Sequence, residues 1–238
     1  MLAIGLQSYS SAYRSMIMSG AQNILMIDTA MEGCGVCVFD GARDMVFDAY
    51  NDEPQGQAQR LIPLVQGVLN DATLGFEDLS DIIVCNGPGT FTGIRIGLSA
   101  AKTFGLVLDI PVWSISSLQA LAMSAIDKGI DRNMLAIVET RRQDFYIQRF
   151  DCKGNALDKA QSVLAEDIVV DDAVLIGNAG QRFDPEGLYT HSDTKLIDVG
   201  IVARSFRNNR EVFNEDVSPI YLREPVVSLP KRKNRKIS

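Results

Sequence analysis

The stretch "DIIVCNGPGTFTGIRIGLSAAKTFGL" (residues 81–106) contains a short apolar segment, a glycine-rich loop and a long apolar segment. The first segment predicts a strand over 79–87, and the spacing of the last predicts a helix over 94–108. A strand that passes through a tight loop into a helix is typical of α/β proteins. Because the first N–H groups of a helix attract anions, such loops often bind phosphate. The stretch therefore raises two alternatives, a nucleotide site or a contact with another protein.

The glycine loop matches the known phosphate-binding motifs only in part. A P-loop places a lysine directly after its last glycine, where it neutralises phosphate charge, and here Ile94 occupies that position. The dinucleotide motif Gly-x-Gly-x-x-Gly would need its third glycine one residue earlier than Gly93. The loop alone is therefore a weak nucleotide signal. Its residues are Gly87, Pro88, Gly89, Thr90, Phe91, Thr92 and Gly93.

The helix expected after the loop is apolar over roughly 200°, about twice the width that a surface helix needs to cover one core. It has two apolar sectors, a bulky one and a small one: Ile96, Ala100, Phe104 and Val107, and Gly97, Ala101 and Gly105. Glycine inside a helix costs about 1 kcal/mol relative to alanine, so the small sector needs a packing reason. Two accounts stay open. The helix is buried between its own sheet and a neighbouring helix, or one sector contacts a second protein.

The second account predicts a partner interface on the first two long helices. The helix expected over 58–72 is also apolar on more than one side and would widen the same patch. Under this hypothesis, Gly97→Leu or Ala101→Leu should block partner binding while leaving the fold largely intact. The expected interface residues are Leu61, Leu64, Val65, Val68, Arg95, Gly97, Leu98, Ala101, Phe104 and Gly105.

Composition and charge limit the remaining classes. The net charge of −7 argues against a chain whose main surface binds nucleic acid. The basic run over 231–236 is expected to be a solvated tail, with contact to RNA or another acidic partner as the alternative. Residues 1–22 lack the pattern of a secretory signal and are expected to form a disordered extension, with translation from a later methionine such as Met16 or Met18 as the alternative. No run of about 18 apolar residues predicts a membrane span.

The residues that catalysis would require do not form a recognisable set. The single histidine, His191, lies in a polar stretch and cannot build a hydrolytic triad or a two-histidine metal site alone. Cys34 and Cys37 have CxxC spacing but lie in an alternating strand pattern, which favours buried structural residues. Four acids near strand ends could hold Mg²⁺, although turn and cap roles are favoured: Asp28, Glu32, Glu139 and Asp144. We expect no catalytic and no metal residues.

A repeated pattern predicts an α/β fold with two lobes. The apolar segments over 23–30 and 34–41 have counterparts over 134–140 and 143–151, and the segment over 173–180 resembles the strand before the glycine loop. This pattern indicates an internal duplication of a strand–strand–helix–strand unit with mixed sheets. The expected parts are a disordered extension (1–22), an N-terminal lobe with the pairing helices (23–112), a C-terminal lobe (113–225) and a basic tail (226–238).

Three motifs, "IDTAMEGCGVCVFD", "NGPGTFTGIRIGLSAAKTFG" and "SPIYLRE", are similar to those of the TsaB family of bacterial tRNA threonylcarbamoyladenosine biosynthesis proteins. This family was formerly grouped with glycoprotease-like (M22-type) peptidases. The resemblance runs from about residue 23 to 225 in matching order. It implies the actin/sugar kinase/Hsp70-like fold, with duplicated mixed sheets flanked by helices. Two motifs depart from the family pattern, at Gln57-Ala58-Gln59 and over 139–146.

The resemblance also implies a cytoplasmic, non-catalytic role. TsaB-like proteins support the catalytic paralogue TsaD, which threonylcarbamoylates N6 of adenosine 37 in tRNAs reading A-starting codons, and the ATPase TsaE joins the assembly. Contact with tRNA would be indirect, and ATP and Mg²⁺ would be carried by the partners. Without the partner, so apolar a patch is expected to form a homodimer. The alternative is an autonomous ATPase or small-molecule kinase of the same fold.

Overall fold

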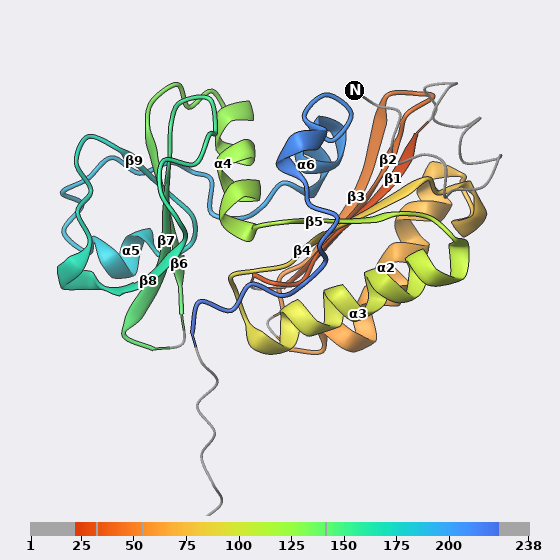
Figure 1. Cartoon of the computed structure of the whole chain (residues 1–238), viewed down its shortest axis with the longest axis horizontal. Helices are drawn as coiled ribbons and strands as arrows, with labels where there is room; N and C mark the ends of the chain where they lie inside the picture. The colour runs from red at the N-terminus through yellow and green to blue at the C-terminus, as the bar shows by residue number, and fades with distance from the viewer. Residues whose placement is uncertain (1–21, 32, 54, 141, 224–238) are drawn as a thin grey trace, which may run out of the picture.

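The computed structural model describes residues 22–31, 33–53, 55–140 and 142–223. The expected disordered extension, apart from Gln22, and the basic tail lie outside the described residues. Two mixed sheets lie side by side, each with helices against it (Figure 1).

The first sheet has the strand order β3-β2-β1-β4-β5. Strands β1 to β3 are antiparallel neighbours, whereas β4 is parallel to β1 and β5 is parallel to β4. All residues of β1, β2 and β4 are buried because helices cover both faces of the sheet. The strands are β1 (Asn23–Asp28), β2 (Cys34–Asp40), β3 (Met45–Asn51), β4 (Asp81–Cys85) and β5 (Val112–Ile115).

Helices α2 and α3 cover one face of this sheet, and α6 covers the other (Figure 1). Thr90 caps α3, since its Oγ1 accepts a hydrogen bond from the Gly93 N–H (3.2 Å). Among helices in the described residues, α3 alone is long and apolar enough to cross a membrane; a helix that covers a sheet has the same length and composition. The helices are α2 (Gln57–Ala72), α3 (Phe91–Leu108), α4 (Ser117–Asp127), α5 (Gly180–Phe183) and α6 (Val199–Ser205), with short 3₁₀ turns η2 (Phe76–Asp78), η3 (Ala165–Asp167) and η4 (Arg210–Val212).

The second sheet, with the order β8-β7-β6-β9, repeats the arrangement of the first four strands of the first sheet. Its first three strands are again antiparallel neighbours, and its fourth is parallel to its first. The predicted duplication of mixed sheets is therefore confirmed, although each unit has three strands rather than two before its parallel strand. One difference is that η3 replaces the long helix that precedes the fourth strand of the first lobe. The strands are β6 (Met134–Glu139), β7 (Asp144–Phe150), β8 (Gln161–Leu164) and β9 (Val174–Ile176).

The division between the lobes differs from the expected one at residue 112. Strand β5 pairs with β4 as far as Ile115, so the first sheet extends past that position. Helix α6, expected in the C-terminal lobe, packs against β1 and β2 of the first sheet. Helix α4 contacts both β6 and α6 and lies between the two sheets (Figure 1). The C-terminal part of the chain therefore helps to build the first lobe.

Residues 214–223, here called the closing segment, also attach to the first lobe. Ser114 and Asn214 exchange two backbone hydrogen bonds (2.8 and 2.9 Å). The Asn86 side chain donates to the Ser218 carbonyl (2.8 Å), and the Ile220 N–H donates to the Asn86 carbonyl (2.8 Å). The segment thus lies across the end of β4, directly before the glycine loop.

Candidate functional site

The glycine loop is packed between the end of β1 and the closing segment. A β-carbon at Gly89 would collide with the Ala30 carbonyl, and one at Gly87 would lie 2.8 Å from the Ile220 carbonyl. Gly87 also has a left-handed backbone (φ 103°), which glycine adopts without strain. The Thr90 N–H donates to the Ala30 carbonyl (2.8 Å). These contacts within the chain account for the loop glycines, so their presence does not call for a bound phosphate.

The small sector of α3 faces the chain's own sheet. Gly97, Ala101 and Gly105 are all buried. A β-carbon at Gly97 would lie 2.5 Å from the Thr29 hydroxyl, and one at Gly105 would collide with Val112. The expectation that these residues form a partner surface is therefore wrong. Their small size lets α3 lie directly on β1, β4 and β5, so leucine there would disturb the fold rather than partner binding alone.

The other expected interface residues are also mostly buried or half-buried. Leu98 of α3 and the α2 residues Leu61, Val65 and Val68 are buried in the core of the first lobe. Leu64 and Phe104 are half-buried, and Phe104 packs on Phe76 with a ring-centroid distance of 5.3 Å. Only Arg95 is exposed. The apolar residues with the most regular helical spacing face the sheet in both helices. They are therefore part of the core and not of an exposed interface.

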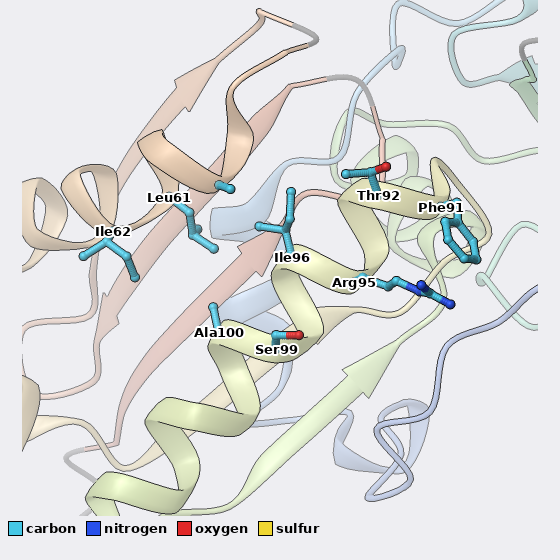
Figure 2. A pocket seen from close by; sticks show the side chains of 9 residues that line it. Leu61, Ile62, Phe91, Thr92, Arg95, Ile96, Ser99 and Ala100 are labelled. Carbon is cyan, nitrogen blue, oxygen red and sulfur yellow. The ribbon is translucent and has the colours of Figure 1, made fainter.

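An open groove of about 530 Å³ lies between α2 and α3 on the side away from the sheet (Figure 2). Apolar side chains form most of its wall, and Arg95 lies at the N-terminal end of α3. Ile62 and Phe91 leave 40% and 46% of their surface exposed, which is a large exposure for residues of this kind. The groove is lined by Ala58, Leu61, Ile62, Phe91, Thr92, Arg95, Ile96, Ser99 and Ala100.

The groove lies between the two helices on which sequence reasoning placed the interface, but other faces of these helices line it. Of the ten expected residues, the groove contains only Leu61 and Arg95. The missed residues had a signal, because Ile96 and Ala100 belong to the bulky sector and Ile62 adjoins Leu61 on a second apolar side of α2. Beyond the groove, Leu106 and Val107 continue the exposed apolar surface of α3, at 84% and 75% exposed.

One end of the groove is fixed to the closing segment. The Arg95 guanidinium lies 3.7 Å from the centre of the Phe91 ring, and its Nε donates to the Tyr221 hydroxyl (3.1 Å). The rings of Phe91 and Tyr221 are 5.3 Å apart. Figure 2 shows Phe91 and Arg95 together at this end of α3. The groove is therefore shaped partly by residues more than 120 positions away in the sequence, since Arg95 and Tyr221 are 126 residues apart.

Asp28 lies buried at the end of β1, beside the glycine loop. Its Oδ1 accepts a hydrogen bond from the Ala30 N–H (2.9 Å). Burial raises the pKa of this carboxyl from 3.8 to about 6, although hydrogen bonds from Ala30, Met31 and Cys85 oppose the change. Burial and then the nearby Asp28 charge also raise the pKa of the Cys34 thiol, to about 12. Asp28 is thus a buried, hydrogen-bonded group rather than an open ligand.

The other strand-end acids make separate contacts. Glu139 pairs with Arg182 (3.1 Å) at the surface, and Asp144 contacts Arg223 in the second lobe. Glu32 lies outside the described residues. Within the described ranges, no three His, Cys, Asp or Glu side chains gather as metal ligands would.

The remaining candidate residues have structural partners. His191 pairs with Asp184 (2.8 Å) in the second lobe, and the contact with His191 is one cause of a lowered Asp184 pKa, together with the Leu188 and Tyr189 N–H groups. Cys34 and Cys37 are both buried in β2. The Cys37 thiol donates to the Val199 carbonyl (3.2 Å). The prediction that the CxxC residues are buried strand positions is confirmed.

The two duplicated mixed sheets with flanking helices define the actin/sugar kinase/Hsp70-like class of α/β proteins. A solved chain from Pseudomonas aeruginosa, described as similar to the peptidase YeaZ, has the same fold, with a TM-score of 0.73 and 24% identity over 85% of this chain and 100% of its own. YeaZ from the same organism gives a TM-score of 0.72 at 23% identity, over 84% of this chain and 100% of YeaZ.

Sequence comparison identifies the family within this fold class. Residues 55–181 match the family model of TsaD, the tRNA N6-adenosine threonylcarbamoyltransferase. The TsaB protein of Escherichia coli (strain K12) is 27% identical over 85% of this chain and 95% of its own length. That of Bacillus subtilis (strain 168) is 34% identical over 60% and 63%, respectively. The chain belongs to the TsaB family of tRNA threonylcarbamoyladenosine biosynthesis proteins.

Proposed function

We propose that the chain is a non-catalytic accessory subunit for N6-threonylcarbamoylation of adenosine 37 in tRNAs that read A-starting codons. In this proposal it works in the cytoplasm, binds a TsaD-type catalytic subunit and shares the assembly with a TsaE-type ATPase. The name of the matching family model supports the reaction, and the names of the TsaB relatives support the pathway.

The observation that carries the proposal is the apolar groove between α2 and α3. Exposed apolar surface of this kind, with a charged group at its edge, is typical of protein-binding sites. The groove is lined by the exposed Ile62 and the half-buried Ile96 and Ala100, with Arg95 and Phe91 at one end. Arginine and aromatic side chains often dominate the binding energy of such interfaces. We infer that the catalytic subunit docks here, and that a second copy of the chain occupies the groove when that subunit is absent.

The glycines of the loop, which pack against the chain itself, and the buried Asp28 support a non-catalytic role over an autonomous ATPase or kinase. The loop glycines are occupied by contacts with Ala30 and Ile220, and the Asp28 carboxyl is buried at 4% exposure. In the proposal, ATP and Mg²⁺ are carried by the partner subunits. Sustained ATP turnover by the purified chain, lost on Asp28→Ala, would contradict it.

Ile62→Glu and Ala100→Glu, separately and together, test the groove. Each change places a carboxylate against apolar surface that the partner would desolvate, so we expect at least about tenfold weaker binding for each. The measurement is size-exclusion chromatography and titration with a TsaD-type subunit from the same cell. A parallel assay of tRNA modification, omitting each component in turn, shows whether the chain is needed.

Leu188→Glu is the matched control, since Leu188 is 72% exposed in the second lobe and far from either helix of the groove in the sequence. This control should leave the complex unchanged. The double variant Ile62→Glu/Ala100→Glu, by contrast, should also convert a homodimer of the chain to a monomer. Normal complex formation by the double variant, with unfolding curves like those of the parent chain, would refute the groove as the docking site.

A further inference from the structure

A second hollow, also of about 530 Å³, lies in the second lobe where β7 and β8 meet the end of the closing segment. Its wall includes Arg142 and Gln143 just before β7, Asp144 at the start of β7, Ser162 from β8, and Arg223. Val163 and Leu164 of β8 complete the wall, so charged and polar side chains line the hollow together with two apolar ones.

Arg223 is held in place at the wall of this hollow. Its guanidinium pairs with Asp144, and its Nε donates to the Ser162 hydroxyl (3.0 Å). Ser162 in turn donates to Asp144, whose other oxygen accepts from the Thr140 hydroxyl (3.0 Å). A buried carboxylate thus fixes one cation in a defined orientation, which is the arrangement that positions an arginine for oxyanion recognition.

Arg142 supplies a second positive charge. Its side chain is exposed and has no carboxylate within ion-pair distance among the residues that the structure describes. Arg142 and Arg223 line the same hollow. Burial, and next the charge of Arg142, lower the pKa of Arg223. Two guanidinium groups and one carboxylate line the hollow, so it carries a net positive charge in a chain whose overall charge is −7.

The sequence after the hollow adds further positive charge. The basic run Lys231-Arg232-Lys233-Asn234-Arg235-Lys236 begins eight residues after Arg223. Clustered arginines, followed in the sequence by a basic run, are a typical footprint for a phosphate backbone.

We propose that the second-lobe hollow binds a phosphate group of tRNA directly, through Arg142 and Arg223. The choice of tRNA as the source of the phosphate rests on the proposed function, whereas the oxyanion chemistry rests on the hollow itself. The chain would then contact RNA through its second lobe while its first lobe holds the catalytic subunit.

Arg142→Glu is the test variant, because its side chain is exposed and its removal leaves the Asp144–Arg223 pair intact. Binding of a fluorescently labelled tRNA transcript is measured by anisotropy over a range of salt concentrations, with the chain alone and in the complex. We expect roughly tenfold weaker binding and a salt slope reduced by about 1, as for loss of one phosphate contact. A chain truncated after residue 225 separates the contribution of the basic tail.

Arg132→Glu is the matched control, with the same charge change at the opposite end of β6, where Arg132 pairs with the exposed Asp172 (2.6 Å). It should bind tRNA like the parent chain. Equal affinity and salt slope for Arg142→Glu and Arg132→Glu would overturn the proposal. So would Arg142-dependent binding of inorganic phosphate or ATP, measured by calorimetry, without an effect on tRNA.

Binding of the TsaD-type subunit is measured on the same variants and should be unchanged. If Arg142→Glu loses tRNA binding but still forms the complex with the TsaD-type subunit, the result supports the hollow as a phosphate site. This result does not depend on where the subunit docks. If the parent chain does not bind the TsaD-type subunit but its tRNA binding depends on Arg142, the result counts against the docking groove and not against the hollow.

Discussion

The carboxyl group of Asp28 connects burial to a measurable dependence of stability on pH. Its pKa is raised from 3.8 to about 6, mainly by burial. Because the folded-state pKa is above the unfolded value, the folded chain binds more protons between these pH values. The contribution of Asp28 to the free energy of unfolding is therefore fully present below about pH 3.8 and is lost as pH rises through 6. This pKa shift corresponds to a change on the order of 3 kcal/mol in the free energy of unfolding.

Asp28→Asn should remove this part of the pH dependence. We expect the free energy of unfolding of the parent chain to fall more steeply than that of the variant between about pH 4 and pH 7. Denaturant unfolding at several pH values measures both slopes. The neighbouring Cys34 and Cys85 thiols keep their protons over this range, since burial raises the pKa of both. Parallel slopes for the two chains would show that Asp28 ionises normally in the folded state.

At the scale of single elements, α3 shows how glycine positions a helix. Gly97→Leu should destabilise the chain by about 3 kcal/mol or more, because the side chain would be forced against Thr29 and Val84 on the sheet. Thr103→Leu, on the exposed side of the same helix, should change stability by no more than about 0.5 kcal/mol. Chemical denaturation of both variants makes the comparison. Similar stability for the two would mean that the small sector does not face the sheet.

The two apolar sectors of α3 could be predicted from the sequence, but the direction in which each sector points could not. Periodicity gives the angle between residues and not which face meets the sheet. In the structure the small sector meets the sheet, where a β-carbon at Gly97 would lie 2.5 Å from the Thr29 hydroxyl. That hydroxyl also donates to the Gly93 carbonyl (2.7 Å). Strand β8 was missed for a local reason, since the four residues over 161–164 are too short and too polar for a clear strand pattern.

At the scale of the whole molecule, the closing segment ties distant parts of the chain together. A chain ending at residue 217 would lose the contacts of Ser218 and Ile220 with Asn86, the contact between Arg95 and Tyr221, and the Arg223 pair. With about 1 kcal/mol for each hydrogen bond, we expect a loss of about 3 to 5 kcal/mol. At 2–4 °C per kcal/mol, the melting temperature should fall by roughly 10 °C.

Truncation after residue 225 is the control, since it removes the basic tail and keeps the closing segment. Calorimetry should give this chain the melting temperature of the full-length protein. If the two truncated chains melt together, the closing segment contributes little to stability.

The duplicated two-lobe architecture was predictable because each half repeats the same local strand patterns. The boundary near residue 112 was not, because it depends on contacts between remote segments. Helix α6 covers β1 and β2 although it follows the whole second sheet in the sequence. Nothing in the local pattern over 198–208 indicates which sheet this helix will cover.

Because α6 is synthesised long after β1 and β2, its packing on these strands has a consequence for folding on the ribosome. The Cys37 thiol and the Val199 carbonyl that accepts its hydrogen bond are 162 residues apart. At 5–20 residues per second, translation of that interval takes roughly 8–30 s. During this time one face of the earliest strands lacks its native helix, so the nascent chain presents an apolar sheet surface that a chaperone can bind.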